Sequence, residues 1–381
     1  MTRAAGSRPP FPPEEIDLAS TAETDDQTPR VLAPPAPAGL SYAFPEAPAP
    51  ARLITVAPGV HWLRMPLPFA LDHINLWLVE DGAPDASGWT LIDTGICRDE
   101  VKALWRRLVA GPMTGRSVRR VIATHFHPDH VGLAGWLAAE HHVPLWMTRG
   151  EWLMTALLQR DVEGVAAAEQ VAFYRRNGLS EDWAAPLAER GNTYRRRIAP
   201  PPAGFHRIVD GEEIAIGDER WTVIVGTGHA PEHACLYCAR LGVLISGDQI
   251  LPKITPNVSL FAGEPDSDPL GDFLRSLDRF RGLPEDTLVL PSHGFPFRGL
   301  GARLDAMAEH HEARLLEIIE ACDTPRTAAE MIPLLFRRTL DVHQIMFAMG
   351  ESLAHLAHLA AAGRLARVIG ADGLVRYRRP A

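Results

Sequence analysis

The sequence predicts an α/β fold followed by a smaller, mostly helical C-terminal domain. Short apolar runs separated by turn residues begin at Leu53, and four of these runs end in a His or Asp beside Gly or Pro. From about Gly301 the composition changes to long helical patterns. Side chains at the ends of strands converge when those ends share one rim, and rigid strand ends hold their geometry well. We therefore expect a functional site at one edge of the β-rich part.

Composition and charge are those of a soluble globular protein. Of the 381 residues, 46% are hydrophobic and 22% are charged, which is ordinary for that class. The net charge of −9 argues against a dedicated nucleic-acid-binding protein, because such domains carry a basic surface. No apolar run approaches the roughly 20 residues needed to cross a bilayer, and the N-terminus lacks a signal-peptide pattern. We expect a cytoplasmic protein that does not bind membranes.

The first fifty residues differ from the rest of the chain. They hold eleven of its 33 prolines, with Ala, Glu, Asp and Thr between them. Such a segment buries too little apolar surface to offset the entropy lost on ordering. We expect residues 1–50 to form a disordered or loosely docked extension.

The β-rich part opens with three strands and a helix. Apolar runs at 60–65, 74–80 and 89–93 are typical of strands, and the Asp-Gly pair between the last two predicts a hairpin. A helix is expected at 99–110. Asp93, at the end of the third strand, either turns the chain or orients a metal-bound histidine from behind.

The strongest motif in the sequence is the segment that begins at His125. It places His125, His127, Asp129 and His130 within six residues, after an apolar run and before an amphipathic helix expected at 131–142. In extended backbone His125 and His127 project to the same side, and the two later residues follow a proline that can begin a helix. Four ligands this close are crowded for one tetrahedral ion but suit two adjacent ions.

Residues 150–205 predict a helical insertion into the β-rich part. The stretch follows a short strand at 143–147 and is polar and helical in pattern, with arginine-rich runs at 174–176 and 194–197. Insertions near a site often form a lid. The arginines either hold an anionic substrate group or form a solvated helix face, and Tyr194 is a further candidate to face the substrate.

Strands resume after the insertion and deliver three more ligand candidates. His229 follows a glycine-rich turn and is a better ligand candidate than His233, which we place in the outer layer of the site. Asp248 and His293 each follow a later apolar run. The expected strands lie at 213–216, 221–225, 234–240, 243–245 and 287–290.

The C-terminal pattern has the outline of a winged helix, over residues 301–381. Three helices are followed by a β-hairpin, and Asp341 is expected to cap the third helix. The expected helices lie at 304–321, 325–338 and 342–362, and the hairpin strands at 365–369 and 374–378.

Taken together, the motif at His125, with His229, Asp248 and His293, resembles the metal-binding set of the metallo-β-lactamase-fold hydrolases. The segment from Asp93 to Gly95 resembles that superfamily's first motif, and the likeness covers about 53–299. The resemblance implies a four-layer αβ/βα sandwich over residues 51–300, with the site at one edge of two packed sheets. The C-terminal part resembles a branch that includes single-strand-specific endoribonucleases.

The resemblance also implies a role for each ligand. Two divalent metal ions are implied, with zinc best suited to the mixed nitrogen and oxygen ligands and iron or manganese as alternatives. Asp129 is the implied catalytic residue, which both binds a metal and orients the nucleophile. The implied ligands are His125, His127 and His229 for the first ion, Asp129, His130 and His293 for the second, and Asp248 as the bridge.

Residues behind or beside the metals form the outer layer of the expected site. Asp93, and more weakly Asp72, His73 and His233, are candidates to orient the ligands. Lys253 either pairs with an anionic substrate group or lies on the surface.

These features predict a hydrolase that uses a metal-bridging hydroxide on a small ester, thioester or lactone. The alternative is a phosphodiesterase or single-strand-specific endoribonuclease with the same metal site, although nucleic acid is not the favoured partner. A non-catalytic protein with a DNA-binding or dimerisation module is a third class. Antibiotic hydrolysis is disfavoured, because Asp248 stands where the main zinc-dependent lactamases use cysteine. The C-terminal domain is expected to form a homodimer contact or a wall of the active-site cleft.

Overall fold

The structure is a computed structural model that describes residues 30–82 and 87–380. Most of the expected N-terminal extension, residues 1–29, lies outside the described part. Within that part, no helix is both long enough and apolar enough to span a membrane.

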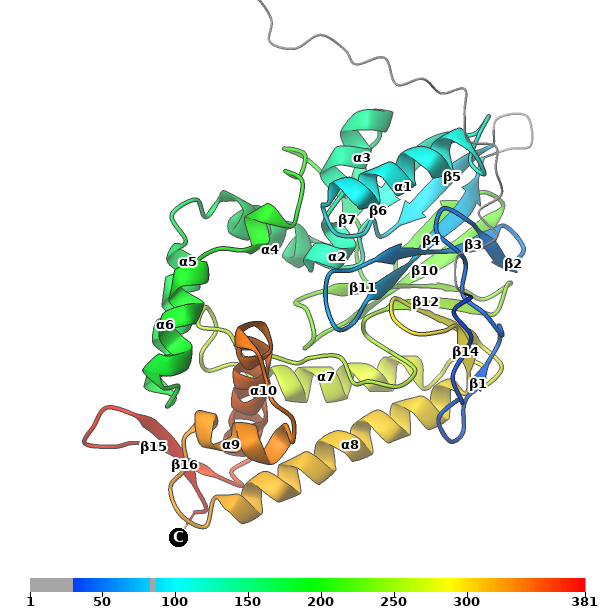
Figure 1. The fold of residues 1–381 in the computed structure, drawn as a ribbon. Helices are drawn as coiled ribbons and strands as arrows, with labels where there is room; N and C mark the ends of the chain where they lie inside the picture. Colours follow the sequence, from blue (N-terminus) through cyan, green and yellow to red (C-terminus); the bar gives the residue numbers. More distant parts are fainter. Residues whose placement is uncertain (1–29, 83–86, 381) are drawn as a thin grey trace, which may run out of the picture. The chain divides into compact units, whose positions relative to one another are not determined.

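The described residues form two seven-stranded sheets (Figure 1). In the first sheet, β2 to β5 are antiparallel neighbours, and β5 to β8 run parallel. Every residue of β5 is buried, as expected for a strand covered on both faces. The strands of this sheet are β2 (Ile54–Ala57), β3 (Val60–Pro66), β4 (His73–Asp81), β5 (Gly88–Ile92), β6 (Ser117–Ile122), β7 (Leu145–Met147) and β8 (His206–Arg207).

The second sheet has the order β1-β14-β13-β12-β11-β10-β9. Its pairs are antiparallel except for β12 and β13, which run parallel. The parallel pair brings the ends of two ligand-bearing strands to the same edge. The strands are β1 (Ser41–Tyr42), β9 (Glu213–Ile216), β10 (Glu219–Gly226), β11 (His233–Cys238), β12 (Val243–Gly247), β13 (Leu288–Pro291) and β14 (Phe297–Arg298).

Alternating side chains build the four layers that the resemblance implied. Trp62 of β3 points into the core between the two sheets, where it meets Trp221 and Leu290 of the second sheet. Its neighbour Leu63 points the other way, into a core covered by α1 (Asp99–Ala110) and α3 (Ala134–His141). Successive strand residues face opposite sides, so one strand serves both cores. The outer face of the second sheet is covered by α7 (Pro269–Leu277), η3 (Asp278–Phe280) and α8 (Leu300–Ala321).

The helix expected at 131–142 is present as α3, but it begins three residues later than predicted. A short α2 (Pro128–Val131) precedes α3, and the break lies at Gly132. There the Leu133 N–H donates to the Gly95 carbonyl over 3.1 Å. A Cβ atom at Gly132 would lie 2.5 Å from that same oxygen. The break therefore lets the segment dock against the loop that contains Asp93.

The insertion is helical, as predicted, and it packs against the C-terminal helices (Figure 1). Phe173, Tyr174 and Leu187 share one apolar core with the C-terminal residues. The Tyr174 hydroxyl donates to the Met346 carbonyl over 3.1 Å. These contacts hold the insertion in place. Its helices are α4 (Arg149–Arg160), α5 (Val165–Arg176), α6 (Glu181–Arg190) and η2 (Tyr194–Arg196).

Three helices and a hairpin complete the chain in the predicted order. Capping boxes begin α9 at Thr327 and α10 at Asp341, so α9 starts three residues later than expected. The apolar residues of this segment share a core with the second sheet and the insertion. The elements are α8, α9 (Ala328–Leu335), α10 (Val342–Ala361), β15 (Ala366–Ile369) and β16 (Val375–Arg378).

The described end of the expected extension is packed rather than loose. Ser41 and Tyr42 pair with β14, and Leu32 forms a bridge with Glu46. The Phe44 ring lies 6.2 Å from that of Trp62. Tyr42, Phe44 and Ala47 pack against the core between the sheets, and the backbone pairs hold the segment there although most side chains of 31–50 remain exposed.

Candidate metal centre

Seven side chains from four strand ends converge at one edge of the two sheets. They form two groups, and within each group the candidate ligand atoms lie within 4.8 Å of one another. The motif after β6 contributes to both groups, and the loops after β10, β12 and β13 supply the rest. The groups are His125, His127, His229 and Asp248, and Asp129, His130 and His293.

Asp248 links the two groups. Its Oδ2 lies 3.6 Å from His229 Nε2 in the first group and 3.5 Å from His130 Nε2 in the second. Its Oδ1 lies 3.4 Å from His293 Nε2. One carboxylate can therefore reach both groups, which is the arrangement that a bridging ligand requires.

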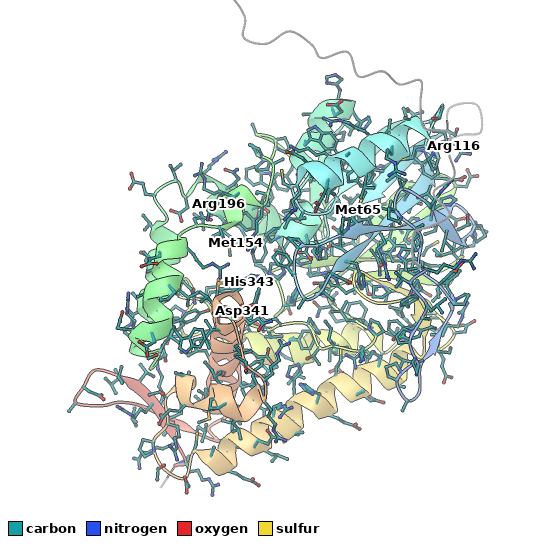
Figure 2. The ribbon with its side chains drawn as sticks, in the orientation of Figure 1. Met65, Arg116, Met154, Arg196, Asp341 and His343 are labelled. Carbon is teal, nitrogen blue, oxygen red and sulfur yellow. The ribbon has the colours of Figure 1, made fainter. Side chains whose placement is uncertain are left out.

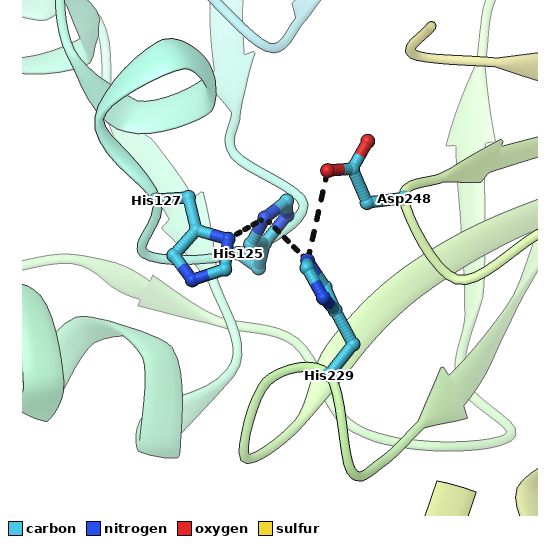
Figure 3. A group of neighbouring side chains, drawn as sticks. All are labelled: His125, His127, His229 and Asp248. Atoms are coloured by element: carbon cyan, nitrogen blue, oxygen red, sulfur yellow. Dashed lines mark hydrogen bonds and ion pairs between the residues drawn. The ribbon is translucent and has the colours of Figure 1, made fainter. Parts of the chain in front are cut away.

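Imidazole nitrogens meet directly in the first group. His125 Nε2 lies 2.9 Å from His127 Nδ1 and 3.3 Å from His229 Nε2 (Figure 3). A neutral imidazole carries one bare lone pair, and burial lowers the pKa of His127 to about 3. Burial and the neighbouring His130 likewise hold the pKa of His125 well below its usual range. These rings are therefore neutral at pH 7 and ready to bind a cation.

Backbone carbonyls beside the outer nitrogens orient two of the rings. Nδ1 of His229 lies 2.7 Å from the Asn257 carbonyl, and Nδ1 of His293 lies 2.8 Å from the His73 carbonyl. A carbonyl can only accept, so in each ring Nδ1 carries a hydrogen. His229 Nε2 then presents its lone pair to the centre, and His293 Nε2 does so once it loses the proton that the neighbouring carboxylates hold there. The outer contacts thus select the tautomer that binds metal.

Asp93 and Thr124 orient the rings of His130 and His125 from behind. Asp93 Oδ2 lies 2.8 Å from Nδ1 of His130. The Thr124 hydroxyl donates to Asp93 over 2.8 Å and lies 3.0 Å from Nδ1 of His125. Asp93 has φ = 60°, a backbone region that non-glycine residues rarely adopt, and such strain concentrates at functional sites.

The residues present fit a pair of divalent cations. In the described part of the chain, His130 Nε2 and Asp248 Oδ1 are buried polar atoms that form no hydrogen bond and make only ion-pair contacts of 3.4 to 3.6 Å within the cluster. Leaving buried polar atoms unsatisfied is costly, and both atoms face the centre of the cluster. Imidazole nitrogens with carboxylate oxygens are the ligands that zinc, iron and manganese accept.

The histidine pKa values are raised in the second group, whereas they are lowered in the first. Burial lowers the pKa of His293, but the carboxylates of Asp248 and Asp129 outweigh burial and raise it to about 10. The same carboxylates hold the pKa of His130 well above its usual range in spite of burial. Burial would raise the pKa of Asp129, yet His130 and His293 lower it to about 2. Without cations, protons therefore hold this group together.

The outer histidines support the loops that carry the ligands. His73 Nε2 accepts from the Gly294 N–H over 3.0 Å, and His73 Nδ1 lies 2.7 Å from Asp72. His233 Nε2 accepts from the Asp248 N–H over 3.1 Å. The structure thus places His73 behind His293 and His233 behind Asp248, neither of them in the groups that converge on the centre.

Tyr194 and the arginines that follow it do not belong to the two ligand groups. The Tyr194 hydroxyl donates to the Phe126 carbonyl over 2.6 Å, so it supports the motif from the insertion. Of the neighbouring arginines, Arg195 and Arg196 donate to backbone carbonyls. The Arg197 guanidinium lies over the ring of Phe69, 5.1 Å from its centroid.

Lys253 is not brought to the cluster. It is exposed and lines a cavity beside α8 and α10. The anion-pairing role open to it therefore concerns that cavity and not the seven converging side chains.

Glu151 and Asn257 are parts of the site that sequence reasoning missed. Glu151 is fully buried and accepts from the Phe126 and Glu232 N–H groups over 2.8 and 2.6 Å. It therefore joins the motif loop to the loop of His233. Asn257 acts through its backbone carbonyl, for which the sequence carries no signal. A Glu in the first turn of an amphipathic helix looks like an ordinary helix-terminal acid.

Comparisons with known proteins agree with this geometry. The family model described as the metallo-beta-lactamase superfamily matches residues 70–293, and the model of a metallo-beta-lactamase-like C-terminal domain matches residues 315–380. A beta-lactamase domain protein from Burkholderia ambifaria has a similar crystal structure. It is 44% identical, with a TM-score of 0.84 over 90% of this chain and 98% of that one.

Two curated relatives are similar over most of their length. A probable metallo-hydrolase of Bacillus subtilis (strain 168) is 26% identical over 78% of this chain and 91% of its own. An acyl-coenzyme A thioesterase of Bos taurus is 27% identical over 66% of this chain and 84% of its own.

Proposed function

The chain belongs to the metallo-beta-lactamase superfamily, and from this membership we propose that it is a dinuclear metal-dependent hydrolase of a small ester, thioester or lactone. The observation that carries the proposal is the position of Asp248, whose two oxygens lie within 3.6 Å of ring nitrogens from both groups. When bound, a pair of divalent cations supplies an activated water and Lewis acidity.

Each group would hold one cation. His125, His127 and His229 would form the first site, and Asp129, His130 and His293 the second, with Asp248 shared. Zinc is the proposed metal, because the donors are mostly imidazole. Metal analysis of protein purified without added metal tests this part.

Asp129 is the proposed catalytic residue. Its low pKa keeps the carboxylate ionised at neutral pH, so it can accept a proton from the attacking water. Asp129 Oδ2 lies 3.4 Å from His293 Nε2 and 3.6 Å from His130 Nε2, which fixes the carboxylate in one orientation. A fixed acceptor orients the water for attack on the carbonyl carbon.

An acyl substrate is favoured over a phosphodiester by two considerations. A relative that is similar over 84% of its own length is an acyl-coenzyme A thioesterase, and the net charge of −9 would repel a nucleic acid backbone. The insertion also favours a small acyl substrate. Its contacts with α10 anchor it, and in that position it would cover a small substrate at the cluster.

The test is turnover by metal-loaded protein of an aryl ester, an acyl thioester, a lactone and bis(4-nitrophenyl) phosphate. We expect hydrolysis of at least one acyl substrate, and a loss of roughly 100-fold or more in kcat for Asp129→Ala. Asp278→Ala, an exposed carboxylate far along the chain, is the matched control. Turnover confined to the phosphodiester would favour the nuclease alternative. No turnover of any acyl substrate by protein of verified metal content would overturn the proposal.

A further inference from the structure

A cavity lies between the loop at 253–257 and the C-terminal helices. Its volume is about 550 Å³, within the size range of small-molecule sites. It is lined by residues of that loop, of α8 and of α9 and α10. Figure 2 shows Asp341 and His343 at the end of α10 that lies nearest the insertion.

The charge of this cavity is opposite to that of the protein. Among the described residues that line it, Lys253, Arg303, Arg314 and Arg338 are basic, and Glu351 alone is acidic. Burial raises the pKa of Glu351 to about 7, so its negative charge at neutral pH is partial. A chain with a net charge of −9 thus gathers cations around one cavity.

Three of these cations have no carboxylate partner in the described part of the chain. Arg303 is 6% exposed, and its guanidinium donates to the carbonyls of Leu251 and Ile254, over 2.5 and 2.7 Å. Lys253 and Arg338 are exposed, and neither forms an ion pair or hydrogen bond there. Only Arg314 is paired, with Glu317 at 2.8 Å. A buried guanidinium without a counter-charge is costly, and an anionic ligand would supply the missing charge.

Asn257 connects this cavity to the metal centre. Its side chain lines the cavity and donates to Glu351 over 3.0 Å. Its backbone carbonyl accepts from Nδ1 of His229. One residue therefore contacts both the cationic cavity and a ligand of the cluster, which makes the two sites neighbours in the fold.

We propose that this cavity binds the phosphorylated portion of the substrate, a diphosphate or bisphosphate group, while the acyl bond lies at the metal centre. A single carboxylate would leave most of the three unpaired cations uncompensated, whereas two phosphates match them. Arginine and lysine are the side chains that recognise phosphate. Phe336 and Phe347 also line the cavity and offer aromatic surface to the organic part. The inference rests on the proposed hydrolase function.

The lysine content of the chain allows a direct test of binding. Lys253 and Lys102 are its only lysines, and Lys102 lies on α1, paired with Asp99 at 3.6 Å. The metal-loaded protein is treated with an amine-reactive acylating agent, with and without adenosine diphosphate at constant ionic strength. Mass spectrometry then gives the acylation rate of each lysine, and metal content is checked afterwards.

We expect adenosine diphosphate at ten times its Kd to slow acylation of Lys253 about tenfold by mass action, with Lys102 unchanged. Arg338→Ala should raise the Kd roughly tenfold, because it removes a charge-assisted contact. The adjacent Arg337→Ala is the control, since Arg337 does not line the cavity and should leave the Kd unchanged. This readout needs no turnover, so it separates failure of the inference from failure of the proposed hydrolase. Equal acylation of Lys253 with and without the nucleotide, or equal effects of the two arginine variants, would overturn the inference.

Discussion

We expect single residues behind the ligands to decide how well this centre binds metal. Asp93 holds the ring of His130 from behind and, through Thr124, that of His125. Carboxylates in this position fix the ring and raise the basicity of the nitrogen that faces the metal. The strained backbone of Asp93 is consistent with a position selected for the site and not for the fold.

The first prediction concerns that carboxylate. Asp93→Asn keeps the shape but removes the charge, so we expect metal affinity to fall about 10–100-fold. Competition with a chromogenic chelator measures the affinity. Asp99→Asn, an exposed carboxylate at the start of α1, should leave it unchanged. Equal affinities for the wild type and Asp93→Asn would show that Asp93 is only a turn residue.

The second prediction concerns Glu151. Burial raises its pKa to about 8 in spite of two backbone hydrogen bonds, whereas an exposed Glu titrates near 4.3. A raised pKa means that the folded state favours the protonated form, so this contribution to stability is present at low pH and lost as pH rises through about 8. In urea unfolding of metal-loaded protein, Glu151→Gln should weaken the fall in stability between about pH 4.3, where the unfolded carboxyl ionises, and about pH 8, where the folded one does. An unchanged pH profile would show that Glu151 is ionised throughout.

Whole elements determine what surrounds the cluster. The insertion is anchored at two points: Tyr174 of α5 donates to α10, and Tyr194 of η2 donates to the motif. Arg197, just after η2, lies over Phe69, whose ring is 5.3 Å from that of His343 at the start of α10. Side chains from the end of the insertion, the loop between β3 and β4, and the start of α10 thus contact one another in a row.

The third prediction follows from this stack. Among the described residues, the Arg197 guanidinium has no hydrogen-bond or ion-pair partner, whereas Arg196 donates to the Arg190 carbonyl. For an acyl substrate with a negative charge, Arg197→Ala should raise KM roughly tenfold with kcat little changed, since it removes a charged contact made before and during reaction. Arg196→Ala is the matched control. Equal KM values for the two variants would leave Arg197 as a packing residue.

The fourth prediction concerns the cap of α10. The Asp341 carboxylate accepts from the N–H groups of His343 and Gln344, both over 2.8 Å. Asp341→Ala should lower the free energy of unfolding by about 1 kcal/mol, as measured by urea unfolding. Asp372→Ala in the hairpin turn serves as the comparison, because it caps no helix. A smaller loss for Asp341→Ala than for Asp372→Ala would contradict the capping role.

At the scale of the whole molecule, the cluster joins the two sheets. His125 to His130 follow β6 of the first sheet, and the other ligands follow strands of the second. The Asn75 N–H also donates to the Ser292 carbonyl across the two sheets, over 2.7 Å. Metal binding therefore ties two halves of the sandwich together, and it should stabilise the fold as a unit.

The fifth prediction concerns protons released by metal. The pKa of His293 is raised to about 10 in the cation-free protein, so this ring is protonated at pH 7 and must lose its proton to bind a metal. Metal uptake should therefore release protons, and affinity should rise with pH. Calorimetry in buffers of different ionisation enthalpy counts the protons released.

Metal affinity should rise with pH, whereas the stability of the cation-free protein should fall with pH. A raised histidine pKa stabilises the fold below about pH 6.5, and that contribution is lost as pH rises through about 10. Cation-free protein should therefore lose stability over this window, and metal-loaded protein should not. Loss of equal size in both forms would contradict the assignment of His293 to the metal site.

The sequence predicted the features that depend on neighbouring residues and missed those that depend on contacts between distant segments. The motif from His125 to His130 and the strand-end positions of His229, Asp248 and His293 were visible because ligand spacing and strand periodicity are local patterns. Most helices and strands followed from the same periodicity, but α7 (Pro269–Leu277) was not predicted. The break at Gly132 was not visible, because it depends on the approach of Gly95 from another segment. The packing of residues 31–50 was missed for the same reason.

The sequence by itself determined the fold class and the candidate ligands, because both are written in the order of apolar, turn and ligand residues along the chain. Only the tertiary structure decided which groups stand behind those ligands. Asn257 acts through a backbone carbonyl and Glu151 through burial, and neither property belongs to a residue type. It also decided that Lys253 lines a separate cationic cavity with Arg303 and Arg338. Charges distant in sequence become one site only when folding brings them within a few ångströms and removes the water between them.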